Sequence, residues 1–234
     1  MQVIFKNKTF FTTLFFAILL LDIFVKLNLE AIPFRFITKP IIVGSLIIYY
    51  LLNNQEEHRR RFIYMCIALS SFLIGDILLI FYEITNAYII GILLFIIGKL
   101  FYAFRFSNEK DFNLTSLMPY FIICFIYMVL IMLLVIDNLG DFFIPAMVYL
   151  FASLIVILFA FLRKNEVIKS SYLLVIAGVF TAVVSDSISL IQSFYYENFP
   201  FHEILIMLVY GISQYLIVMG ITNERKIKEE SILF

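Results

Sequence analysis

The chain has 234 residues, of which 63% are hydrophobic and 15% are charged, and its formal net charge is zero. Soluble domains are about 25% charged, so this composition excludes an ordinary soluble fold and predicts one integral membrane domain over residues 1–234. The zero net charge gives no general attraction to nucleic acid.

Apolar runs separated by short polar segments predict an all-α polytopic membrane helix bundle. A helix needs about 20 apolar residues to cross the hydrocarbon core, and a helix satisfies every backbone polar group internally. Eight runs approach that length, so we expect eight transmembrane helices at 10–27, 38–52, 62–82, 86–106, 117–136, 142–163, 170–194 and 202–221.

The distribution of lysine and arginine predicts the orientation of the chain. Thirteen of the 17 cationic residues fall on the side of the two termini, whereas Lys26, Arg35 and Lys39 fall on the opposite side. Cytoplasmic loops carry the excess of Lys and Arg, so we expect both termini in the cytoplasm. The richness in Ile, Phe, Lys and Asn is typical of a bacterium, so we expect the bacterial inner membrane.

A weak internal repeat relates the two halves of the chain. Gly75-Asp76 and Ser185-Asp186 occupy the third and seventh runs, 110 residues apart. A Gly-x3-Tyr pattern also recurs in the fourth and eighth runs. These matches predict a four-plus-four parallel repeat, although chance similarity among eight apolar helices is the alternative.

The two aspartates within apolar runs are the first candidates for function. A charge at the centre of a membrane helix costs about 2.5–3.5 kcal/mol on insertion scales, so such residues pair, stay protonated or face a polar cavity. Asp186 lies beside a stripe of small residues that lets helices approach closely. We expect Asp76 and Asp186 to face one shared cavity as catalytic residues. The alternative is a structural role, tying helices together through serine hydroxyls or Lys39.

Further polar residues are expected to line this cavity or bind substrate. Lys99 lies in mid-span and either neutralises an aspartate or extends to the membrane surface. Asp22 is expected at the membrane interface. With only two histidines, no metal site of usual spacing can be built, and we expect no cofactor. The complete set of cavity or substrate residues is Lys39, Lys99, Tyr102, Ser185, Tyr210 and Gln214.

Four motifs, taken in order, resemble those of the lysoplasmalogenase family (YhhN-like), small membrane proteins of eight helices. They are Lys39-Pro40, Gly75-Asp76, the run from Gly178 to Ser185-Asp186-Ser187, and Tyr210 with Gln214-Tyr215-Leu216-Ile217. Two departures stand out. Lys99 takes the place of the family's usual histidine, and Ser213 takes the place of an alanine.

The resemblance implies hydrolysis of the vinyl ether bond of lysoplasmalogens, giving a fatty aldehyde and a glycerophospho-head group. The expected partners are then a lysophospholipid substrate and membrane lipids, with no nucleic acid and the oligomeric state left open. Two carboxyl groups suit this chemistry, because one protonates carbon while the other stabilises the resulting cation. A proton-coupled transporter or lipid-binding protein, and a family member that has lost catalysis, are the alternatives.

Overall fold

The computed structural model describes residues 5–107, 114–196 and 201–225. Within these residues the chain is helical and contains no strand, which confirms the all-α prediction. The long helices are α2 (Lys8–Asn28), α3 (Phe36–Asn53), α4 (Arg59–Leu78), α5 (Thr85–Phe106), α6 (Leu114–Leu139), α7 (Phe143–Leu162), α8 (Lys169–Phe194) and α9 (His202–Thr222). Short helical turns are η1 (Ala31–Arg35), η2 (Leu79–Phe81), η3 (Gly140–Phe142) and η4 (Arg163–Asn165).

Seven continuous helical stretches of the described chain are long and apolar enough to cross a membrane. The longest, Leu117–Asn165, has 49 residues and would span about 73 Å as one straight helix, more than twice a hydrocarbon core of about 30 Å. The chain instead reverses at Gly140, whose φ of 48° favours glycine. The eight expected spans therefore correspond to α2–α9.

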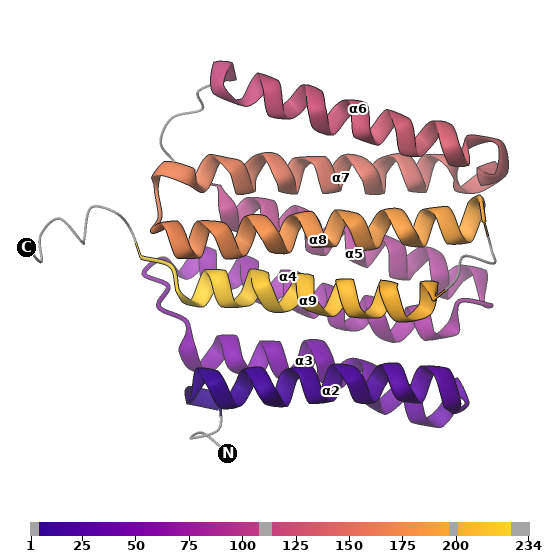
Figure 1. Ribbon diagram of the computed structural model, residues 1–234, viewed down its shortest axis with the longest axis horizontal. Helices are drawn as coiled ribbons and strands as arrows, with labels where there is room; N and C mark the ends of the chain where they lie inside the picture. Colours follow the sequence, from indigo (N-terminus) through magenta and orange to yellow (C-terminus); the bar gives the residue numbers. More distant parts are fainter. Residues whose placement is uncertain (1–4, 108–113, 197–200, 226–234) are drawn as a thin grey trace, which may run out of the picture.

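Consecutive helices run in opposite directions (Figure 1). The most extensive contacts join α8 to α9 and α4 to α5, while α6 lies at the edge of the bundle against α7 and α8. Close approach of α8 to α9 depends on Gly178, because a Cβ there would lie 2.9 Å from the backbone nitrogen of Ile217. This tight pair fixes the face of α8 that carries Asp186.

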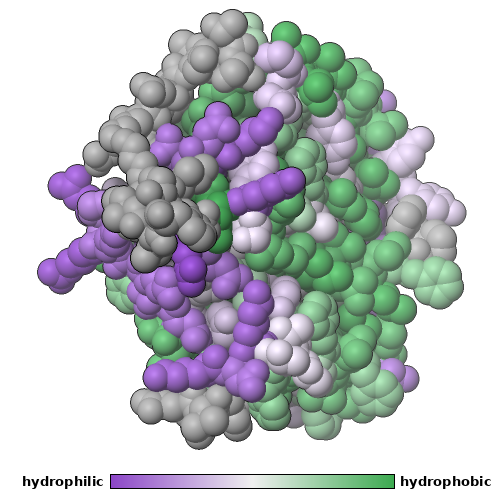
Figure 2. Space-filling view, turned by 60° about the vertical axis from the view of Figure 1, so that its left-hand side comes forward, coloured by the Kyte–Doolittle hydropathy of each residue, from purple (hydrophilic) through white to green (hydrophobic). Residues whose placement is uncertain are grey.

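Hydrophilic side chains gather at the end of the bundle where α2 begins and α9 ends, and we call it the terminal end (Figures 1 and 2). The rest of the face seen in Figure 2 is mostly hydrophobic. The opposite end, where α2 ends and α9 begins, is called the distal end. Exposed cations of the terminal end include Lys8, Arg59, Arg60, Lys164, Lys169 and Arg225.

A cluster of ion pairs joins five segments at the terminal end. Glu224, just beyond α9, accepts from Arg105 of α5 at 3.0 Å and from Arg163 of η4 at 2.6 Å. It also lies 3.6 Å from Arg61 of α4. Arg105 in turn donates to Glu56 at 2.6 Å. Because Arg105 and Arg163 are buried, the cluster depends on its carboxylates for charge balance.

Loss of the Glu224 charge should destabilise the fold in a pH-dependent way. Burial raises the pKa of this carboxyl, but Arg105 and Arg163 outweigh burial and hold the pKa below its ordinary value of 4.5. A lowered pKa stabilises the fold above about pH 4.5, and this contribution is lost as the pH falls through the lower, folded-state value. Glu224→Gln should therefore cost about 3 kcal/mol at pH 7, leaving Arg163 buried without a carboxylate.

Thermal unfolding of the wild type and Glu224→Gln at pH 7 and at decreasing pH provides the measurement. The difference in Tm between the wild type and Glu224→Gln should become smaller as Glu224 of the wild type becomes protonated. Glu83→Gln, at an exposed position, should leave Tm unchanged. An equal gap at every pH would contradict the ionic role of Glu224.

Candidate active site

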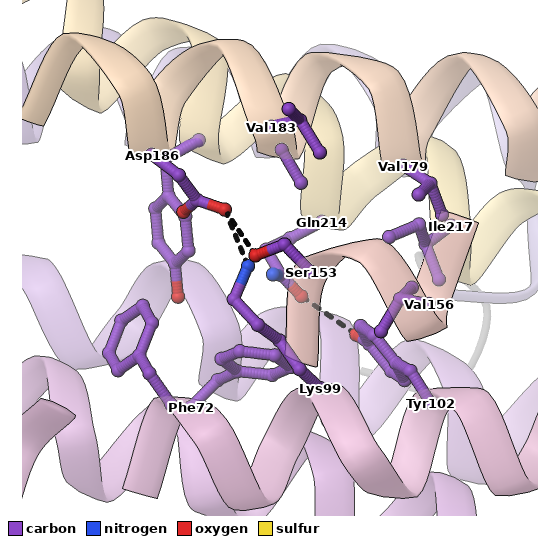
Figure 3. Close-up of a pocket in the computed structure, with 13 residues that line it drawn as sticks. Phe72, Lys99, Tyr102, Ser153, Val156, Val179, Val183, Asp186, Gln214 and Ile217 are labelled. Carbon is purple, nitrogen blue, oxygen red and sulfur yellow. Dashed lines mark hydrogen bonds and ion pairs between the residues drawn. The ribbon is translucent and has the colours of Figure 1, made fainter. Parts of the chain in front are cut away.

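A small buried cavity lies among α4, α5, α7, α8 and α9 (Figure 3). Its volume of about 20 Å³ suits one water molecule, which needs roughly 10–15 Å³ by the same measure. Aromatic and aliphatic side chains form most of the wall. The polar lining residues are Lys99, Tyr102, Ser153, Asp186, Tyr210 and Gln214. The lining of the cavity is therefore mostly apolar, with a few polar groups that point toward one another.

Asp186 is the most fully bonded group of this cavity. Its Oδ2 lies 2.5 Å from Lys99 Nζ and accepts from Ser153 Oγ at 3.2 Å (Figure 3). Its Oδ1 accepts from the hydroxyl of Tyr149 at 2.5 Å. Lys99 Nζ also lies 4.6 Å from the centre of the Tyr149 ring, a cation–π contact. Of the two alternatives for Lys99, the structure shows the one in which it neutralises an aspartate.

Helix geometry explains how these groups meet. Tyr149 and Ser153 are four residues apart on α7, so their side chains lie on one face. The small residues Ala182 and Gly178 lie about one and two turns before Asp186 on α8 and let that helix approach its neighbours. The carboxylate thus enters the space among α5, α7 and α8, where Lys99 supplies the opposite charge.

Asp76 forms a second buried ion pair outside the cavity lining. Its Oδ1 lies 3.2 Å from Lys39 Nζ, and its Oδ2 accepts from the hydroxyl of Tyr210 at 2.7 Å. Only Tyr210 of these three lines the cavity. The sequence predicted that both aspartates face one shared cavity, but the structure connects Asp76 to it through Tyr210.

The difference follows from the partners of the two aspartates and not from their depth. Both lie 17 residues after the first residue of their helices, Arg59 of α4 and Lys169 of α8. Asp76 pairs with Lys39 in the first turn of α3, whereas Asp186 pairs with Lys99 of α5, which lines the cavity.

The remaining predicted residues divide between the cavity and helix packing. Tyr102 donates to the side-chain oxygen of Gln214 at 2.7 Å, and both residues line the cavity (Figure 3). Ser185 was also expected there. It instead donates to the backbone oxygen of Ile206 on α9 at 3.2 Å, because its place on α8 faces the tightly packed α9.

Sequence reasoning missed two polar residues. Tyr149 and Ser153 bind Asp186, and their four-residue spacing in an otherwise apolar run was the available signal. Asp22, which was expected at the membrane interface, lies six residues before the end of α2, where it is fully buried and accepts from Thr38 Oγ1 at 2.5 Å. Among the described residues, no three His, Cys, Asp or Glu side chains come together as a metal site.

A double-mutant cycle should reveal strong coupling between Lys99 and Asp186. Lys99→Met leaves the carboxylate with only neutral donors, and Asp186→Asn leaves the ammonium unpaired, so each change should cost about 3 kcal/mol or more. The double variant should lose at least about 1 kcal/mol less than the sum. Chemical unfolding in detergent provides the measurement.

The control combines Lys99→Met with Asp137→Asn, which changes an exposed aspartate and should give additive losses. Additivity in the Lys99/Asp186 cycle as well would show that the two side chains do not form the observed ion pair in solution.

Comparison with known proteins identifies the family. The model of the YhhN family matches residues 34–221, a range that contains all of the polar cavity residues and both buried ion pairs. The searches of curated proteins and of solved structures found no match. Because the family match covers most of the chain, the protein belongs to the YhhN family, the family to which lysoplasmalogenases belong.

Proposed function

We propose that the protein is a lysoplasmalogenase-like hydrolase that cleaves the vinyl ether bond of a lysophospholipid. Family membership supports this class of reaction. The single observation that carries the proposal is the partly buried Lys99–Asp186 ion pair beside a cavity of one water's volume. The reaction needs a proton donor, a negative charge near the cation and one water, and the site offers the first two groups and space for the water.

In the proposed mechanism the Lys99–Asp186 pair supplies the proton. The two groups, 2.5 Å apart, share a proton that passes to the β-carbon of the vinyl ether, and the electrons of the double bond form the new C–H bond. The positive charge then rests on the adjacent carbon and the ether oxygen. The Asp186 carboxylate stabilises this cation in a low-dielectric site, where such interactions are strong.

Water completes the reaction. It adds to the carbon that carries the ether oxygen and returns a proton to the Lys99–Asp186 pair. The resulting hemiacetal collapses to a fatty aldehyde and a glycerophospho-alcohol, so one vinyl ether and one water give two products. The cavity has room for one water molecule but not for an acyl chain, so substrate binding requires the surrounding helices to separate.

Asp76 takes part through Tyr210 in this proposal. Tyr210 lines the cavity, and its hydroxyl donates to Asp76, whose charge is balanced by Lys39. This bond directs the hydroxyl proton toward Asp76 and leaves the lone pairs of the oxygen able to accept or to face a positive charge. Tyr210 thus presents an oriented oxygen to the developing cation, and Asp76 positions it.

A proton-coupled transporter is the second candidate. Buried polar groups extend from Asp22 and Lys39 near the distal end, through Asp76 and Tyr210, to the cavity. Such chains conduct protons in pumps and transporters. The unbroken helices α8 and α9 count against this reading, since broken helices are typical of transporter sites. Proton uptake into vesicles, driven by a lipid gradient and without aldehyde formation, would favour it.

The replacement of the family's histidine leaves a third possibility, a member that has lost catalysis. Lys99→His separates this from the main proposal. An inactive wild type that gains aldehyde release with histidine would identify the degenerate case, whereas an active wild type supports lysine as the working residue.

We also propose that both termini are cytoplasmic and that the membrane is the bacterial inner membrane. The concentration of exposed cations at the terminal end supports this orientation. Cysteines introduced at positions 59–61 should react with an impermeant reagent only after the cytoplasmic side is opened, and labelling from outside would reverse the assignment.

Both aspartates should be needed for turnover. Asp186→Asn and Asp76→Asn should each lower aldehyde release from a lysoplasmalogen by about 10² or more, the usual scale of general acid–base catalysis. If Asp76 acts through Tyr210, then Tyr210→Phe should give a similar loss, and the double variant should lose little more than either single variant.

The controls separate chemistry from folding. The alkyl-ether analogue should bind without reacting, because it has no double bond to protonate, and Asp137→Asn at an exposed position should keep full activity. Full activity of Asp186→Asn would contradict the mechanism. If the fold losses in turnover of Asp76→Asn and Tyr210→Phe multiply in the double variant, the two residues act separately.

A further inference from the structure

The three cations of the distal end converge on one place. Lys26 at the end of α2 lies 3.9 Å from Glu203, and Arg35 of η1 donates to the sulfur of Met207 at 3.4 Å. Glu203 and Met207 are one turn apart on α9. Lys39 lies one turn after Arg35 along the chain. We call Lys26, Arg35 and Lys39 the distal basic cluster.

Arg35 lacks an anionic partner in this cluster. A guanidinium has five N–H donors, yet among the described residues the hydrogen bond of Arg35 is to a thioether sulfur, a weak acceptor. Its Nε is buried without any hydrogen-bond partner, which is costly for a charged donor. Lys39, in contrast, is held by Asp76 at 3.2 Å. The nearby buried carboxylate of Asp22 bonds to Thr38 and not to Arg35.

Lys26 is also available to an incoming anion. Its pair with Glu203 is long at 3.9 Å, and the Glu203 side chain is 42% exposed. The Lys26 side chain is 18% exposed, and its distance from Glu203 is beyond hydrogen-bond range. An anion with oxygens at hydrogen-bond distance would therefore bind Lys26 more closely than Glu203 does. Arg35 and Lys26 together therefore offer two cations and an unfilled, buried N–H to a ligand with several oxygen acceptors.

The position of these cations fits the head group of the proposed substrate. Met207, beside Arg35, is three residues from Tyr210 on α9, a rise of about 4.5 Å. In a lysoplasmalogen, seven bonds separate phosphorus from the vinyl carbon that is protonated. That path extends to about 8 Å at the length per bond of an extended chain. A phosphate at Arg35 would therefore place the vinyl ether beside Tyr210 and the cavity.

We propose that Arg35 and Lys26 form the phosphate-binding subsite for the lysophospholipid head group, an assignment that rests on the proposed function. The phosphate takes the place of the Met207 sulfur at Arg35 and accepts from Nε as well. The substrate then approaches from the distal end, with its head group at the membrane surface and its chain toward the bundle interior.

Binding of non-reacting ligands tests this subsite without relying on turnover. Isothermal titration in detergent compares an alkyl-ether lysophosphatidylethanolamine with a 1-alkylglycerol, which has no phosphate. Arg35→Gln should weaken binding of the phosphorylated ligand about tenfold or more, the scale of a charged hydrogen bond, and leave the alkylglycerol unchanged. Lys26→Gln should act in the same direction, and Arg60→Gln, an exposed cation of the terminal end, should have no effect.

Two further arms complete the test. Glycerophosphate should bind at least about tenfold more weakly than the lysolipid, because it lacks the chain; equal affinity would assign the subsite to a free anion and overturn the lipid assignment. Equal weakening of both ligands by Arg35→Gln would show a structural role and overturn the subsite. Arg35→Lys, which keeps the charge, should retain part of the discrimination and serves if glutamine prevents folding.

Aldehyde release distinguishes this proposal from the function on which it rests. A wild type that binds the phosphorylated ligand selectively through Arg35 but releases no aldehyde would contradict hydrolysis and leave the subsite standing. A wild type that releases aldehyde while Arg35→Gln keeps the same KM for the lysoplasmalogen would overturn the subsite alone.

Discussion

The arrangement of the bundle depends on the need to neutralise Asp186 within the hydrocarbon. An unpaired carboxylate there is costly, and its compensation comes from Lys99 on α5 together with hydroxyl donors on α7. The helix pair α7 and α8 must therefore meet α5, which precedes it in the chain, at one depth. The same contacts leave a small, mostly apolar cavity beside the Lys99–Asp186 pair. The groups that neutralise Asp186 are therefore also the groups of the proposed chemistry.

The two buried carboxylates are held in a corresponding way. Asp76 on α4 is bound by Lys39 of α3 and Tyr210 of α9. Asp186 on α8 is bound by Tyr149 of α7 and Lys99 of α5. The first half of the chain holds α2–α5 and the second half α6–α9. These positions correspond as a four-plus-four repeat would require, because the last helix of each half binds the aspartate of the other half: α5 through the Lys99 ion pair and α9 through the Tyr210 hydrogen bond. The repeat itself stays a prediction.

Composition and run length were sufficient to predict the helices, because a membrane restricts the chain to long apolar segments. They also identified Asp186 and Lys99, because charges are rare in such segments. The sequence could not show that these two residues pair with each other. It gives the position of a residue along its helix, but not which helices lie side by side. Tyr149 was missed because tyrosine is also a common interfacial anchor. The burial of Asp22 could not be predicted, because it depends on the packing of α3 against α2, which its own segment does not encode.

Isotope transfer from the solvent tests the central claim most directly. Turnover of a lysoplasmalogen in heavy water, with immediate trapping of the aldehyde to stop later exchange, reports whether carbon is protonated by the enzyme. The mechanism at Lys99 and Asp186 predicts a trapped aldehyde with a single deuterium at the carbon next to the carbonyl. An aldehyde without deuterium, or no aldehyde from the wild type, would contradict the account.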